Sequence, residues 1–142
     1  MANNANPFRL FWPEIDDAAS AKAASRLGAI AAILYCLQLA GTATYVIVRN
    51  VRASPDEIQF AYVAALIYAV LAAGIWQLWR APAIVAFVLY LAYQVLSAII
   101  EGGISGYIIV GALTLFFLSG VRGTLAYKKL SQLPPRVDLR DV

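Results

Sequence analysis

Three kinds of residue are scarce in this chain, and each scarcity excludes a class of site. None of the 142 residues is histidine, which excludes haem ligation by histidine, histidine-based zinc sites and catalytic histidine dyads. The single cysteine, Cys36, has no intramolecular partner and excludes a disulfide framework. Charged residues make up 13% of the chain, against roughly 25% in a soluble domain. With 62% hydrophobic residues, this composition indicates an integral membrane protein.

Long apolar runs define the candidate membrane spans. Residues 27–48 and 58–79 are each long enough to cross a bilayer, which takes about 20 apolar residues. The third run, 83–121, holds Glu101 as its only charged residue and would be roughly 58 Å long as one helix. That length is about twice the hydrocarbon thickness of a bilayer, so this run must turn back on itself.

The turn within the third run is expected at Gly102 and Gly103, because paired glycines end helices and adopt positive φ without a steric penalty. Pro82 then falls in the first turn of the third helix, where its missing N–H is harmless. The predicted fold is an all-α integral membrane protein with four transmembrane helices in an up-down bundle. The predicted spans are 27–48, 58–79, 83–100 and 104–121.

The distribution of positive charge predicts the orientation. If the N-terminus is cytoplasmic, every Lys and Arg except Arg49 and Arg52 falls on the cytoplasmic side, which matches the positive-inside rule. Both termini are therefore expected in the cytoplasm.

Two segments flank the predicted four-helix domain, 27–121. Residues 1–26 carry aromatic residues, with Pro13 as a possible helix start and acidic residues behind it. They predict either an interfacial amphipathic segment or a plain extension of the first span. Residues 122–142 are basic and polar with a Pro-Pro pair, which predicts a flexible cytoplasmic tail.

Polar residues recur at helical spacing in three of the spans and lie toward the outer side of each. This pattern predicts a polar groove in the outer half of the bundle, or hydrogen bonds that only hold the helices together. The candidate groove residues are Tyr35, Gln38, Thr42, Tyr45, Tyr90, Gln94, Ser97, Glu101, Tyr107 and Thr114. Glu101 is expected at the outer rim, as a turn cap or an ion-pair partner of Arg49 or Arg52, with proton coupling as the less favoured alternative.

Small and basic residues supply two further sets of candidates. Two pairs of small residues have the four-residue spacing that lets membrane helices approach closely: Gly102 with Gly106, and Ser119 with Gly123. Arg122, Lys128 and Lys129 form a basic cluster next to the fourth span, and we expect them to contact anionic lipid headgroups.

No nucleophile with a base, metal-ligand set or nucleotide loop occurs in the sequence, so we expect no cofactor and no enzymatic activity. The sequence favours an accessory subunit, assembly factor or scaffold that binds other membrane proteins or itself, and not nucleic acid. The alternative is a small oligomeric transporter or channel, and an enzyme acting on lipid or quinone comes third. Alanine-rich spans and short loops favour a bacterial inner membrane protein.

Overall fold

The computed structural model describes residues 13–49, 54–101 and 107–132, and all of its regular structure is helical. The helices are α2 (Ala18–Val48), α3 (Pro55–Trp76), α4 (Arg80–Glu101) and α5 (Tyr107–Leu130). All four are long and apolar enough to cross a membrane. The prediction of an all-α chain with four helices, each long and apolar enough to span a membrane, is therefore confirmed.

Helix α2 begins nearer the N-terminus than the predicted span. The Asp17 side chain accepts a hydrogen bond from the Ser20 amide, and the Ser20 side chain accepts from the Asp17 amide, so the two residues form a capping box. Pro13 precedes the helix and does not start it, and the acidic residues also precede its first turn. Residues 18–26 are thus a continuous extension of the first span, whereas residues 1–12 lie outside the described part of the chain.

Local signals in the sequence account for the start of α3, and a tight turn joins α3 to α4. Ser54 caps α3 in a second capping box with Glu57, and Pro55 opens the helix. After α3, Leu78 has a positive φ of 64°, and the Leu78 and Trp79 amides donate to the carbonyls of Ile75 and Gly74. This is a Schellman motif with leucine at the position that usually holds glycine.

The other predicted helix ends agree with the structure in some places and differ from it in others. Pro82 lies in the first turn of α4, as predicted. Helix α4 ends at Glu101, and the predicted turn at Gly102 and Gly103 lies outside the described residues. Helix α5 continues through residues 122–130, where a flexible tail was expected.

The two unexpected extensions pack against each other, which explains why both are helical. A Cβ atom added to Gly123 would lie 2.6 Å from the Ala21 carbonyl oxygen and 2.9 Å from the Ala24 carbonyl carbon. Thr124, Ala21, Ala24 and Gly123 are all buried. The start of α2 and the end of α5 therefore stabilise each other beyond the predicted spans.

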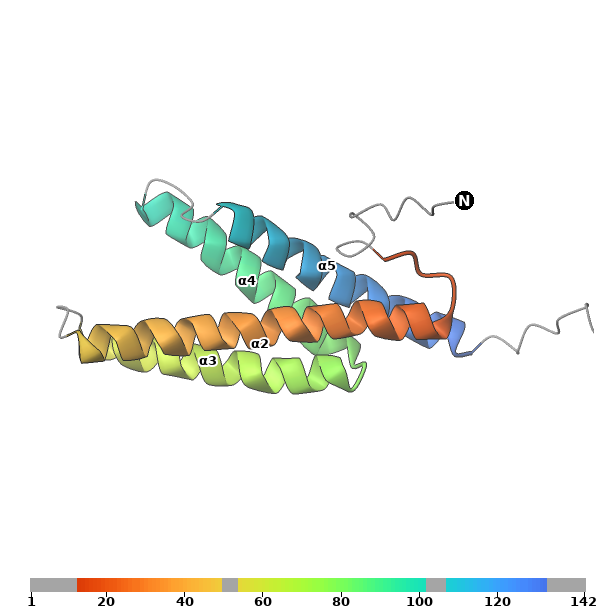
Figure 1. The fold of residues 1–142 in the computed structure, drawn as a ribbon, viewed down its shortest axis with the longest axis horizontal. Helices are drawn as coiled ribbons and strands as arrows, with labels where there is room; N and C mark the ends of the chain where they lie inside the picture. Colours follow the sequence, from red (N-terminus) through yellow and green to blue (C-terminus); the bar gives the residue numbers. More distant parts are fainter. Residues whose placement is uncertain (1–12, 50–53, 102–106, 133–142) are drawn as a thin grey trace, which may run out of the picture.

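Figure 1 shows two hairpins, α2–α3 and α4–α5, that meet at one end and diverge toward the other. The end that carries the start of α2 and the end of α5 is called the inner end, after the predicted orientation, and the opposite one the outer end. Near the inner end Gly28 faces Gly120, and a Cβ atom on Gly28 would lie 2.6 Å from the Gly120 Cα. Such close backbone contact requires glycine on both helices.

The core combines small residues with a few large aromatic ones. Alanines fill the contacts between helices, among them Ala29, Ala32, Ala72 and Ala86. Most large aliphatic side chains of α4, by contrast, are exposed on the surface that would face lipid. Burial thus concentrates near the junction of the two hairpins.

Candidate functional site

An aromatic cluster lies where the two hairpins begin to diverge. The Tyr35 ring of α2 contacts Tyr68 of α3 and Tyr90 of α4 edge to face, with centroid distances of 4.7 and 5.0 Å. Phe117 of α5 lies 5.1 Å from Tyr90 and 6.4 Å from Tyr68. Each helix contributes one ring, and pairs of this kind add about 0.5–1.5 kcal/mol beyond burial. The cluster therefore links the two hairpins where they begin to diverge.

The hydroxyl groups of this cluster differ in their partners. The Tyr90 hydroxyl donates to the Val110 carbonyl at 3.2 Å, and the Thr114 hydroxyl donates to the same carbonyl at 2.7 Å. The buried Tyr68 hydroxyl has no hydrogen-bond partner among the described residues. Buried polar groups are normally hydrogen-bonded, so the Tyr68 hydroxyl retains an unused donor at the junction.

A groove opens from this cluster toward the outer end, between the diverging hairpins. It consists of two adjoining cavities of about 250 and 510 Å³ that share Leu39, Phe60 and Tyr93. Tyr35, Tyr68 and Tyr93 line the deeper cavity, whose other walls are apolar. We call this space the aromatic groove.

The mouth of the aromatic groove is acidic. Asp56 and Glu57, in the first turn of α3, are the charged residues that line the outer cavity. A Glu57 carboxylate oxygen already accepts from the Ser54 amide at 3.0 Å in the capping box, which leaves Asp56 as the freer carboxylate. The groove therefore combines an apolar interior with a negatively charged entrance.

A polar surface lies on the exposed side of α2. Gln38, Gly41, Thr42 and Tyr45 are all exposed, and they follow one another at helical spacing. Thr42 satisfies its hydroxyl by donating to the Gln38 carbonyl at 2.9 Å. The Gln38 side-chain amide makes no hydrogen bond with any described residue. We call these four residues the α2 polar face.

The predicted groove residues therefore separate into two groups. Tyr35, Tyr90 and Thr114 lie in or beside the aromatic cluster, and Gln94 lies next to the Tyr90 hydroxyl. Gln38, Thr42 and Tyr45 belong instead to the α2 polar face. Ser97 is half-buried on α4, and the side chains of Glu101 and Tyr107 are outside the described part of the structure.

The groove residues that sequence reasoning did not single out belong mainly to α3. Phe60, Val63, Ile67 and Tyr68 line the deeper cavity and recur at helical spacing. This stripe is visible in the sequence. It carries only one hydroxyl, however, and resembles any other apolar face of a membrane helix.

The predicted packing and lipid-contact residues lie near the inner end. Ser119 and Gly123 are buried on the side of α5 that faces α2, while Gly102 and Gly106 lie outside the described residues. Lys128 and Lys129 are exposed in the last turn of α5, and Arg122 is half-buried.

No group of three or more metal-ligating side chains occurs among the residues that the structure describes. No family model matches the sequence, and no curated protein and no solved structure matches it either.

Proposed function

We propose that this chain is a non-enzymatic subunit that binds another membrane protein through the α2 polar face. The observation that carries the proposal is the Gln38 side chain, which is exposed near the middle of the predicted span 27–48 and has no described hydrogen-bond partner. An amide placed in hydrocarbon without a partner is costly. A hydrogen-bonding group on a neighbouring transmembrane helix would remove that cost.

The surroundings of Gln38 suit a helix as the partner. Gly41 is exposed, and a Cβ atom added to it would meet nothing within 4 Å, so a second helix can approach the α2 backbone there. Thr42 and Tyr45 lie next to this opening and offer further hydroxyl groups. The proposed partner is therefore a transmembrane helix with a polar side chain at mid-bilayer depth.

The proposed setting is the bacterial inner membrane, with both termini in the cytoplasm. The distribution of Lys and Arg supports this orientation. In this orientation the α2 polar face would lie in the central and outer part of the bilayer.

The test is purification in a mild detergent of the full chain and of two variants. We expect the wild-type chain to retain one stoichiometric membrane partner, and Gln38→Leu to retain clearly less of it. An interhelical hydrogen bond contributes about 1 kcal/mol, so the affinity should fall roughly fivefold. Gln59→Leu removes an exposed glutamine from α3 and should retain the partner. Equal retention by Gln38→Leu and the wild-type chain, or a lone protein with measurable flux in liposomes, would contradict the proposal.

Self-association is distinguished from binding to a different subunit by co-expressing two differently tagged copies. If one copy retrieves the other, and Gln38→Leu weakens the retrieval, the partner is a second copy of this chain. If only a different protein is retrieved, the chain is an accessory subunit.

The aromatic groove favours a second candidate function, a small oligomeric transporter. The groove has an acidic entrance at the outer end, whereas the contact between Gly28 and Gly120 holds α2 against α5 near the inner end. Transport would require this contact to open in alternation with the groove. Flux of an apolar cation into liposomes, abolished by Asp56→Asn, would favour this function over the first.

A further inference from the structure

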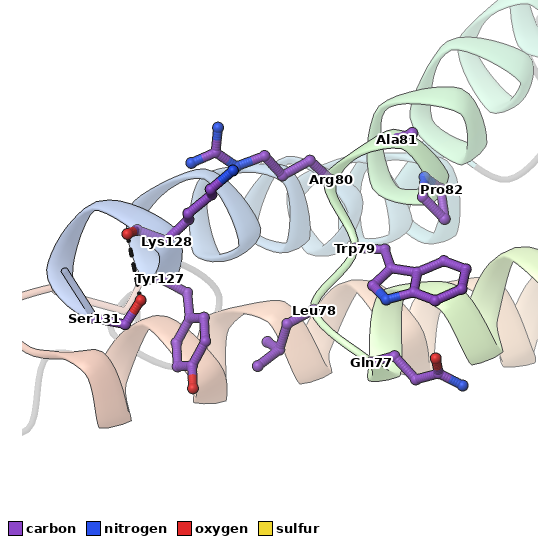
Figure 2. A pocket seen from close by; sticks show the side chains of 9 residues that line it. All are labelled: Gln77, Leu78, Trp79, Arg80, Ala81, Pro82, Tyr127, Lys128 and Ser131. Carbon is purple, nitrogen blue, oxygen red and sulfur yellow. Dashed lines mark hydrogen bonds between the residues drawn. The ribbon is translucent and has the colours of Figure 1, made fainter.

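A second pocket lies at the inner end of the bundle, between the α3–α4 connection and the last turns of α5 (Figure 2). Its volume is about 670 Å³. Leu78, Trp79 and Arg80 line one side, and Tyr127, Lys128 and Ser131 line the other. We call it the inner pocket. It shares no residue with the α2 polar face.

The charged residues that line the inner pocket are both cationic. Arg80 donates from Nη2 to the Leu125 carbonyl at 3.3 Å, which holds its side chain along α5. Its Nε atom is buried and has no hydrogen-bond partner among the described residues. Lys128 is exposed and forms no ion pair with the described part of the chain. Two cationic side chains in one pocket, one of them a guanidinium whose N–H donors are not all satisfied by described residues, match an anion that accepts several hydrogen bonds.

The backbone beside Arg80 adds to this preference. Arg80 and Ala81 are the first residues of α4, and no described group accepts a hydrogen bond from their amides. Free N–H groups at a helix start carry partial positive charge and favour an anion. Pro82 follows them in the first turn and contributes no N–H.

The pocket also has apolar walls, and its depth matches the membrane surface. Trp79 is 60% exposed at the end of the predicted second span, where tryptophan marks the boundary between hydrocarbon and headgroups. Leu78 projects into the pocket from its left-handed backbone conformation, next to Tyr127 in Figure 2. An occupant would thus contact cations on one part and apolar side chains on another.

We propose that the inner pocket binds the phosphate group of one anionic phospholipid of the inner leaflet. Arg80 and Lys128 bind the phosphate, and Leu78 and Trp79 contact the glycerol and upper acyl region. The inference is independent of the proposed function, because the two sites lie at different depths and on different elements.

The test measures binding of phosphatidylglycerol to the full chain in neutral detergent by native mass spectrometry. Lys128→Gln is compared with Lys129→Gln, which removes the neighbouring exposed lysine that does not line the pocket. A diffuse attraction of about 1 kcal/mol per basic residue would weaken binding about fivefold in both variants. A specific phosphate contact should weaken binding about tenfold or more in Lys128→Gln and clearly less in Lys129→Gln.

Equal effects in the two variants would overturn the proposal. So would equal binding of zwitterionic phosphatidylcholine, or no retained phosphatidylglycerol in the wild-type chain. Inorganic phosphate distinguishes the source of the anion: if it displaces the lipid at equal concentration, the pocket is a site for a soluble anion. Arg80→Lys keeps the charge but removes the Nε donor, and we expect it to bind phosphatidylglycerol more weakly than wild type. Circular dichroism of each variant checks that the helices are intact.

Discussion

The contact between Gly28 and Gly120 gives the sharpest test of how the hairpins are joined. A Cβ atom added to Gly28 would lie 2.6 Å from the Gly120 Cα, whereas carbon atoms in contact are normally about 3.5–4.0 Å apart. In Gly28→Ala the two helices must therefore separate by about 1 Å at this point. Forcing extra volume into a packed contact costs about 1–3 kcal/mol.

Gly111→Ala is the matched control, because Gly111 is exposed in α5 and a Cβ atom there meets nothing within 4 Å. Both alanines gain the same helix propensity, about 1 kcal/mol over glycine. The difference between the two variants thus isolates the steric cost, which we expect to be about 2 kcal/mol. Unfolding by sodium dodecyl sulfate in mixed micelles, followed by circular dichroism, measures it.

A Gly28→Ala variant as stable as Gly111→Ala would refute the close contact. The double variant Gly28→Ala/Gly120→Ala adds a second readout. Because the first substitution already forces the two helices apart, the second should cost less than it does alone. Strict additivity would mean that the two glycines do not face each other.

Three further predictions concern single groups. Leu78→Gly should raise the free energy of unfolding by about 1 kcal/mol, because glycine adopts the left-handed conformation without strain. The β-branched Leu78→Val should lower the free energy of unfolding, measured in the same assay. Tyr68→Phe removes a buried hydroxyl without a described partner and should stabilise the protein by about 1 kcal/mol. Tyr90→Phe loses a hydrogen bond and should destabilise the protein by roughly 0.6 kcal/mol. The opposite order of stability would contradict the partners assigned to the two hydroxyl groups. The hydrogen bond from the Ser20 amide holds the pKa of Asp17 below its usual range, so the cap stabilises the helix above the unfolded pKa of about 3.9 and is lost as pH falls through the lower folded pKa. The Ser20 amide resonance should titrate with that lower midpoint in NMR, and Asp17→Asn should abolish the titration.

The number and approximate position of the spans could be read from the sequence alone. The position of a span follows from hydropathy, which depends only on nearby residues. The number of spans follows from length, because a run such as 83–121 is too long to cross a bilayer only once. Local caps are also encoded locally: the capping box at Ser54 and the early Pro82 need only their neighbours.

Only the tertiary structure decided which side of each helix faces inward. Tyr35 and Gln38 belong to one predicted stripe, yet Tyr35 is buried in the aromatic cluster and Gln38 is exposed. Lipid tails are as apolar as a helix interface, so the hydrophobic pattern does not fix the rotation of a membrane helix as it does in water. The helical extensions 18–26 and 122–130 likewise depend on each other across the bundle. Their close contact through Gly123 is long-range packing, which no local window of the sequence contains.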